Sequence, residues 1–391
     1  MNSAKWVVPA LALSCPMLMG QTYDELSIFR NRPLPWADAL QVKGGMIGSI
    51  ASEENELNGN VDEIAWDGHV YYHQSKRGSD TALDAYAGRD GAIASYRNAD
   101  WLGNQNILRL EGGMRYFPFW REGYYDGDDT FNRTGSYEGS DYDGYVGFGR
   151  RLDQDFLIEF GPYVHGYDFE STGKTPDFVP PDAFQAYGAR IFFEHNTAEF
   201  ARTAILPTKG FVATVLVERE WNNSNSTIGD PFNPNGYTSG LPDAVWRARG
   251  KMHWYVPAGS SSIWEFLLDG SFADETDRVV TYDAQKPLLG HTWGDGQMRL
   301  RFDAGSSFSF APFVQLQYTQ VLQEDGQGSD KLFFFGGGAE AWLNFSDALS
   351  LNAWYSYLNN ESRPPVSTTD DVYGEHMFFV GMVLRFTGVR R

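Results

Sequence analysis

The sequence contains very little cysteine. The only one among its 391 residues is Cys15, which lies in an N-terminal stretch that we expect to be removed on export. A mature chain that begins at Gln21 has no cysteine left, which excludes disulfide bonds, thiolate metal sites and a cysteine nucleophile. We therefore expect backbone hydrogen bonding and side-chain packing to hold the fold together.

Long apolar runs are also missing. A membrane-spanning helix needs roughly 18 consecutive apolar residues, and no segment of this chain approaches that length. The mean hydropathy of the chain is correspondingly low, at -0.41. The sequence therefore excludes a bundle of membrane-spanning helices.

Residues 1–20 have the pattern of a secretory signal peptide. Lys5 is an early cation, a mostly apolar stretch follows it, and Gly20 supplies a small residue at the end. This order is typical of an exported chain. A lipoprotein signal that uses Cys15 is the alternative, although the residues before this cysteine form a poor lipobox. We expect cleavage near Gly20, followed by a short periplasmic N-terminal segment at 21–40.

Positive charge is scarce. The chain has 31 Lys and Arg residues against 51 Asp and Glu residues, which gives a formal net charge of -20. Because phosphate binding needs clustered cations, this balance argues against nucleic-acid partners. The acidic residues gather in polar segments at 53–56, 126–143 and 274–283. We expect these segments to be loops at a cell surface, where divalent cations are candidate partners.

Signatures of catalysis are absent as well. The seven histidines are scattered singly, and the chain has neither a His-Glu-x-x-His motif nor a Gly-x-Ser-x-Gly motif. His165 shares a predicted face with Glu159, which leaves a hydrolase as an alternative, but a lone histidine of this kind usually hydrogen-bonds within a wall. We predict no catalytic residue, no cofactor and no metal site.

Alternation is what the sequence has in abundance. Between about 42 and 386, apolar and polar residues alternate in stretch after stretch. Within 297–303, for example, Met298, Leu300 and Phe302 share one face and polar residues share the other. Successive side chains of a strand point to opposite faces, so one face of such a strand suits lipid and the other suits water. The pattern predicts the strands of a membrane β-barrel.

About sixteen segments show this alternation, an even number as single-chain bacterial barrels require. Short and long connections alternate along the chain: tight turns such as 152–154 and 305–307 are followed or preceded by long polar loops such as 120–141 and 275–295. This alternation is not expected of a sandwich or a propeller. We predict an all-β fold: a transmembrane antiparallel β-barrel at 41–387, with short periplasmic turns and long extracellular loops, in the outer membrane of a Gram-negative-type bacterium. The predicted strands are 41–51, 61–74, 80–89, 91–98, 105–119, 142–152, 155–168, 184–197, 209–221, 244–257, 262–274, 296–304, 308–321, 331–343, 348–359 and 375–387.

The C-terminal strand adds independent support. The segment that contains Gly381, Leu384 and Phe386 alternates in polarity and ends on an aromatic residue, although 387–391 extends beyond it. It resembles the C-terminal signal by which outer-membrane barrels are recognised. This resemblance implies that the barrel assembly machinery inserts the chain among outer-membrane lipid and lipopolysaccharide. An ordinary closing strand of a soluble β domain is the alternative.

A family resemblance appears in the middle of the chain. The predicted turn with Pro207, Lys209 and Gly210 precedes an amphipathic strand that carries a glutamate, and 101–104 looks like a hydrophobic-Gly entry to an early strand. These motifs, and the order of the strands that follow, resemble the barrel of the BamA/TamA outer-membrane assembly superfamily, also called the bacterial surface-antigen family. The resemblance implies a plug loop at 275–295.

The chain departs from that family in two respects. The family's plug loop carries an Arg-Gly-aromatic tip, whereas this loop offers Leu289, Gly290, His291 and Trp293. Only 21–40 separates the expected signal peptide from the first predicted strand, so we expect none of the family's periplasmic repeats. The resemblance therefore concerns the barrel part and not the apparatus that collects client chains.

Charged residues gather on the predicted inner face. Cross-strand neighbours lie about 5 Å apart, so opposite charges on adjacent strands can pair as a ladder. Such charges either rigidify the wall or, where they are unpaired, form a selectivity constriction with a transverse field. The expected ladder consists of Arg247, Arg249, Lys251, Glu265, Asp269, Arg299, Arg301 and Asp303, and the other inward charges are Arg109, Glu111, Arg115, Glu218 and Glu220.

Aromatic residues are expected on both faces. Trp246, Trp254 and Trp264 point outward in the predicted parity and fit an aromatic girdle at the membrane boundary. A sugar-stacking slide inside the lumen is the alternative role for aromatic residues, and it needs inward rings. The candidates for that role are Tyr163, Tyr167, Tyr255 and Trp354.

Three functions fit a barrel of this kind. The first is a channel or transport pore whose mixed-charge lumen is narrowed by 275–295. The second is an assembly or secretion factor of the BamA/TamA type that opens laterally between the first and last strands. The third is a structural or adhesive surface barrel whose loops bind a partner. The expected absence of client-binding repeats favours the channel.

Overall fold

The computed structural model describes residues 36–51, 63–75, 81–88, 91–125, 131–153, 155–171, 179–200, 207–224, 226–228, 239–274, 290–322, 329–359 and 375–389. The expected signal peptide lies outside these residues. In the part of the chain that is described, no helix is long and apolar enough to cross a membrane. The strands are β1 (Trp36–Ala51), β2 (Glu63–Ser75), β3 (Thr81–Gly88), β4 (Gly91–Asn98), β5 (Asn106–Tyr125), β6 (Phe131–Arg151), β7 (Phe156–Ser171), β8 (Phe184–Asn196), β9 (Glu199–Phe200), β10 (Pro207–Asn222), β11 (Thr227–Ile228), β12 (Ser239–Gly240), β13 (Ala244–Pro257), β14 (Ser262–Ala273), β15 (Gly290–Ala304), β16 (Phe308–Leu322), β17 (Ser329–Asn344), β18 (Leu349–Leu358) and β19 (Glu375–Val389).

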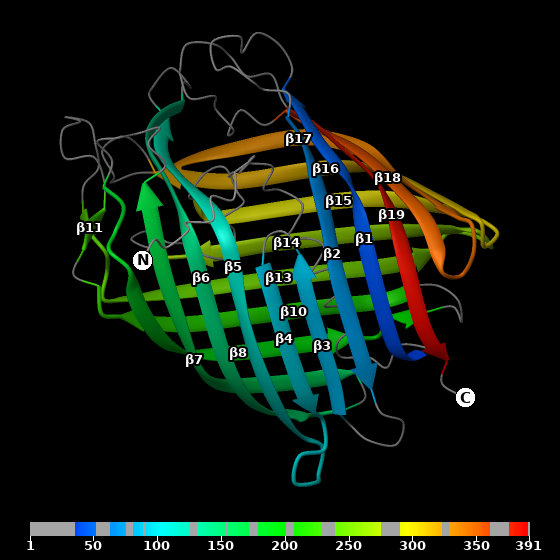
Figure 1. Cartoon of the computed structure of the whole chain (residues 1–391), viewed down its shortest axis with the longest axis horizontal. Helices are drawn as coiled ribbons and strands as arrows, with labels where there is room; N and C mark the ends of the chain where they lie inside the picture. Colours follow the sequence, from blue (N-terminus) through cyan, green and yellow to red (C-terminus); the bar gives the residue numbers. More distant parts are fainter. Residues whose placement is uncertain are drawn as a thin grey trace, which may run out of the picture.

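Sixteen of these strands form one closed antiparallel ring, and β9, β11 and β12 are short additions to it. Each strand of the ring pairs with its sequence neighbours, and the ring closes where β1 pairs with β19 (Figure 1). In this seam the register runs from Trp36↔Val389 to Ala51↔Glu375. The predicted antiparallel barrel is therefore confirmed.

The outside of the barrel is apolar. In β19, Val380, Met382 and Phe386 are exposed, whereas the alternate residues Phe379 and Val383 are buried in the interior. The same holds around the ring for large outward side chains such as those of β2, β7 and β17. An apolar outer face on a closed ring of strands is the arrangement that a lipid bilayer requires. The transmembrane nature of the barrel is confirmed by this surface.

Glycine and phenylalanine shape the seam. Gly45 of β1 lies opposite Gly381 of β19, and the ring of Phe379 lies over both glycines. A Cβ atom on Gly45 would lie 2.7 Å from Cζ of Phe379 and 2.4 Å from the carbonyl oxygen of Val380. The two strands can therefore approach under the aromatic ring only because these positions carry no side chain.

The longest strands are β5 and β6, and they correct one prediction. The expected loop at 120–141 was wrong, because β5 continues to Tyr125 and β6 begins at Phe131. The pairing of β5 with β6 shifts register between Tyr116 and Phe119, an interval that contains Pro118. Proline cannot donate to the ladder, and a bulge of this kind bends a strand.

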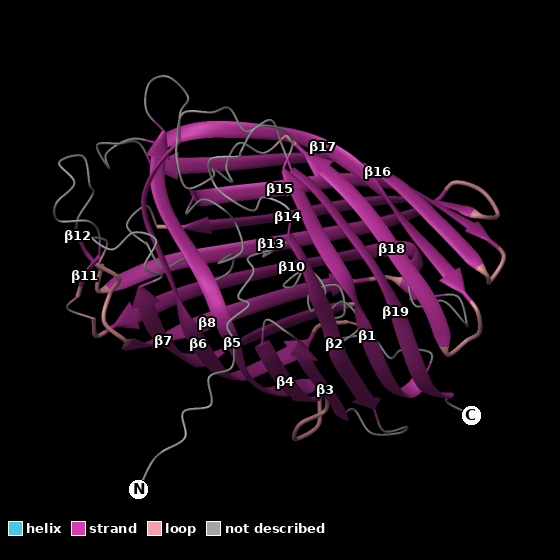
Figure 2. Ribbon diagram, turned by 45° about the horizontal axis from the view of Figure 1, so that its top comes forward, coloured by secondary structure: helices cyan, strands magenta, loops and turns pink. Residues whose placement is uncertain are grey.

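The bent β5–β6 hairpin reaches across the barrel. β5 and β16 lie on opposite sides of the ring, yet their Cα atoms approach to within 8 Å. Figures 1 and 2 both show the far end of β5 turned toward the ends of β16 and β17. This hairpin lies at the end of the barrel where most connections are long, which the predicted parity assigns to the extracellular side. Within the described residues, the strands of this hairpin therefore narrow that end of the barrel.

Three other boundaries differ from the sequence prediction. β1 begins at Trp36, earlier than the expected 41. β15 begins at Gly290, so Gly290, His291 and Trp293 belong to a strand and not to a plug loop. Glycine has weak strand propensity, but Gly290 pairs with β16 and Trp293 pairs with both β14 and β16, which extends the strand over this segment. Pro207, Lys209 and Gly210 likewise begin β10 and are not part of the preceding turn.

The seam glycines allow a matched test of closure. We expect Gly45→Val to destabilise the folded barrel by about 1 to 3 kcal/mol, because backbone and ring atoms occupy the space of the new side chain. Gly44→Ala is the control, since a Cβ there meets nothing within 4 Å. The measurement is the urea midpoint of the folded, heat-modifiable form in detergent. Equal midpoints for the two variants would contradict close packing at the seam.

Candidate functional site

The inner wall of the barrel carries most of the polar chemistry. Because side chains alternate along each strand, the residues between the outward apolar positions all point inward, and they come from many strands at once. In the described residues these inward groups form rows of charged pairs. The strongest row crosses β7, β10 and β13.

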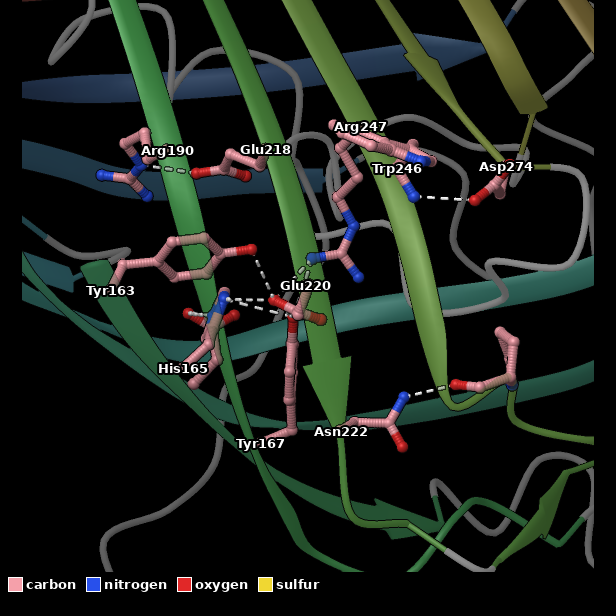
Figure 3. A network of polar contacts seen from close by, with 12 residues as sticks. Tyr163, His165, Tyr167, Arg190, Glu218, Glu220, Asn222, Trp246, Arg247 and Asp274 are labelled. Carbon is pink, nitrogen blue, oxygen red and sulfur yellow. Dashed lines mark hydrogen bonds and ion pairs between the residues drawn. The ribbon is translucent and has the colours of Figure 1, made fainter. Parts of the chain in front are cut away.

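Glu220 of β10 lies at the centre of that row. We call Glu220 and the four side chains around it the Glu220 network; these four are Tyr163, His165, Tyr167 and Arg247 (Figure 3). Arg247 donates to Glu220 at 2.9 Å, and the hydroxyls of Tyr163 and Tyr167 donate to the same carboxylate at 3.2 and 3.3 Å. His165 lies 3.7 Å from it. Glu220 and Arg247 are only 2 and 3% exposed, so solvent does not reach this carboxylate.

Two more arginines are held nearby on the same wall. Arg190 of β8 pairs with Glu218 at 2.5 Å and approaches Glu111 at 3.9 Å. Arg109 of β5 pairs with Glu159 of β7 at 3.0 Å, and Glu159 is completely buried. Each guanidinium also lies over an aromatic ring, Arg190 over those of Tyr145 and Tyr163 and Arg109 over that of Phe192. This part of the wall is a packed, rigid network.

Part of the expected ladder across β13, β14 and β15 is more exposed to solvent than the Glu220 network. Arg249 and Lys251 both face Asp269, at 2.9 and 3.6 Å. These three side chains are 17, 18 and 25% exposed, so this carboxylate and its cations line accessible space. Arg247 belongs to the same strand but pairs with β10, so the structure does not bring it to the acidic residues of β14.

The rest of the ladder continues toward β17. Arg301 pairs with Glu265 at 2.7 Å and lies 3.6 Å from Asp303. Arg299 donates to Gln297 and lies 3.4 Å from Glu340 of β17. Glu340 was not among the predicted residues, because inward-facing residues were predicted on some strands only. Applying the same alternation to β17 would have placed Glu340 on the inner face. Arg190 was missed for the same reason.

Arg301 also connects the ladder to the family-like segment. It donates to the carbonyl oxygen of Pro207 at 2.5 Å. This contact links β15 to the start of β10, although β13 and β14 lie between these two strands in the sheet. Lys209 forms an exposed pair with Glu199 at 3.0 Å. Gly210 has a φ of 103°, and a Cβ atom there would lie 2.3 Å from the carbonyl oxygen of Thr197, so only glycine fits.

The remaining predicted residues are placed as follows. Gly381 is buried at the seam and Leu384 and Phe386 face outward. Leu289 lies outside the described residues, as do the side chains of Arg115, His291 and Trp293. The acidic segments at 53–56 and 275–283 lie outside them too. Within the described part of the chain, no group of three His, Cys, Asp or Glu side chains could hold a metal ion.

Comparison with known proteins shows likeness in structure only. No protein-family model and no curated protein matches the chain. BamA from Haemophilus ducreyi lacking POTRA domains 1-3 aligns with a TM-score of 0.52 and 10% identity, over 90% of this chain and 70% of that one. CdiB from Acinetobacter baumannii aligns with a TM-score of 0.50 and 10% identity, over 89% of this chain and 60% of that one.

Both structures are sixteen-strand barrels of the BamA/TamA type. The resemblance to that superfamily is therefore confirmed, and at this identity it concerns the fold. Together with the apolar outer face, it makes the chain a multi-pass outer-membrane β-barrel, as is found in Gram-negative bacteria.

The different burial of the two rows predicts different costs of substitution. We expect Arg247→Met to lower the free energy of unfolding by about 3 kcal/mol, because it leaves the buried Glu220 without its cation. Lys251→Met, on the same strand and face, should cost less than about 1 kcal/mol, since Asp269 keeps Arg249 and some water. Urea titrations in detergent measure both values. A smaller cost at Arg247 than at Lys251 would show that the Glu220 network is not structural.

Proposed function

We propose that the chain is an outer-membrane channel whose mixed-charge lumen is narrowed at its outer end. The observation that carries this proposal is the partly exposed row of paired charges on β13, β14 and β17, at Arg249, Asp269 and Glu340. Charged side chains held on an accessible inner wall contact permeating solutes and discriminate among them by charge. The buried Glu220 network stiffens the same wall, because it ties β13 to β10 and β7.

Two structural features supply the narrowing in this proposal. The bent β5–β6 hairpin approaches β16 from across the ring, and the start of β10 is held over the inner wall by Arg301. Of the expected plug loop at 275–295, the segment 275–289 lies outside the described residues, so its contribution stays a proposal. A lumen of this kind passes small polar solutes and excludes folded chains.

An assembly or secretion factor is the second candidate, and the likeness to BamA and CdiB favours it. Such a role in this chain requires the β1–β19 seam to open toward the membrane. The seam is paired along the whole of β1 and packs Phe379 over its glycines, which supports passage through the lumen instead. In both candidates we propose outer-membrane lipid and lipopolysaccharide around the apolar belt, the barrel assembly machinery as the partner during insertion, and divalent cations at the acidic loops.

The channel proposal predicts conductance that depends on the hairpin. Purified protein in a planar bilayer should give discrete current steps, and replacing 121–136 by an Asn-Gly turn should increase their size, because this change removes the part of β5 and β6 beyond the bulge. Removal of the β11–β12 ribbon at 227–240 is the control and should leave the steps unchanged. A silent bilayer with all three proteins would contradict a channel.

The seam provides the test that separates the two candidates. Gly44 and Met382 are opposite each other on the outer face, so a Gly44→Cys, Met382→Cys variant can be crosslinked across the closure. We expect the oxidised variant to conduct as the reduced one does and to leave the levels of other outer-membrane proteins unchanged in cells. The single Gly44→Cys variant is the control for oxidation. Loss of other surface proteins on crosslinking would support lateral opening and an assembly role.

A further inference from the structure

On the inner wall beside the β1–β19 seam, cations contact neutral groups and aromatic rings, whereas several cations elsewhere in the lumen contact carboxylates. Lys43 of β1 and Arg385 of β19 both point inward, at the positions that alternate with the exposed Met46 and Met382. Neither cation has a carboxylate partner among the described residues. Elsewhere on the inner wall, acidic groups face the arginines Arg109, Arg190, Arg247 and Arg301.

Neutral groups hold Arg385 in place. Its Nη1 donates to the hydroxyl of Ser350 at 3.2 Å and its Nε donates to Oε1 of Gln41 at 3.5 Å. The guanidinium lies 5.0 Å from the ring centre of Trp342. These contacts orient the guanidinium without neutralising its charge, and the described residues offer no partner to Nη2.

Lys43 is held in a similar way. Its ammonium group lies 4.3 Å from the ring centre of Phe379, the residue that covers the seam glycines. The ring of Trp354 stacks on Phe379 at 6.3 Å. A ring face attracts a cation by about 0.5 to 2 kcal/mol, but it supplies no negative charge. The ammonium therefore keeps its net charge and its capacity to donate hydrogen bonds.

The register places the two cations within reach of one ligand. Lys43 lies opposite Val383, and Arg385 lies opposite Gln41, so the two are diagonal neighbours. Such neighbours are separated by about 7 to 8 Å, a distance that long side chains can close. Gln41 shares a hydrogen bond with His69 of β2 at 3.1 Å. Polar side chains from four adjacent strands therefore converge on one patch of the inner wall, which we call the seam patch: Gln41, Lys43, His69, Ser350 and Arg385.

We propose that the seam patch binds the carboxylate or phosphate group of a permeating solute. This inference rests on the proposed channel function and names the class of solute. A guanidinium with unused N–H groups beside an ammonium group is a combination that binds such anions through charge-assisted hydrogen bonds. The arginines Arg109, Arg190 and Arg247 of the opposite wall are already paired with carboxylates. An anion in the lumen is therefore directed to the cations of the seam.

Ion selectivity in a planar bilayer tests the proposal. The full-length protein is compared with a Lys43→Gln, Arg385→Gln variant under a potassium chloride gradient. We expect the reversal potential of the variant to shift toward cation preference. The control is Lys331→Gln, which removes an exposed cation on the outward face of β17 and should leave the reversal potential unchanged.

Pyrophosphate provides a second readout of the same site. It should reduce the current through the wild-type channel, and the concentration for half block should rise roughly tenfold or more in the double variant, because two charge-assisted contacts are lost. Arg385→Lys keeps the charge and should retain most of the block. Heat-modifiability in gels confirms that each variant is folded before it is measured.

The outcomes separate this inference from the channel proposal. A conducting wild-type protein whose selectivity and block are the same in the double variant overturns the anion site and leaves the channel standing. A silent wild-type protein overturns the channel, and calorimetric titration of the detergent-solubilised full chain with pyrophosphate then decides about the site. Heat of binding in the wild type that is lost in the double variant supports the site, and equal or absent heat in both proteins overturns it.

Discussion

Closure of the sheet between β1 and β19 is the constraint on which the rest of this barrel depends. In a bilayer every strand must find partners for its N–H and C=O groups on both sides, because lipid offers none. The first and last strands can satisfy each other only if their registers match along the seam, as they do from Trp36 to Ala51. The glycines beneath Phe379 allow this approach, and they place an aromatic ring inside the lumen at the seam.

Closure also determines where the charges lie. Once the ring is complete, one face of every strand meets lipid and the other meets the interior, so each inward arginine needs compensation within the lumen. On β5 to β15 the compensation comes from carboxylates, and buried pairs such as Arg247 and Glu220 stiffen the wall. At the seam it comes from ring faces and neutral acceptors. The two kinds of compensation give opposite sides of one lumen different electrostatic character.

Much of the fold could be predicted because its signal is local. Sixteen alternating segments correspond to the sixteen strands of the ring, and the tight turn at 305–307 is where the prediction placed it. The failures lie where the local signal is weak. Glycine and polar residues at 290–296 conceal the start of β15, and Pro118 conceals the continuation of β5. In both places pairing with neighbouring strands decides the structure.

Alternation by itself determined that this chain forms strands, which side chains face lipid, and which charged residues face the interior. These properties follow from the period of two residues along a strand and need no knowledge of neighbours. Only the tertiary structure decided which charges meet. Arg247 pairs with β10 and not β14, and Arg301 reaches Pro207. Lys43 and Arg385 have no acid beside them among the residues that the structure describes. The physical reason is that partners are set by strand register and by the bending of strands across the ring, which depend on the whole closed sheet.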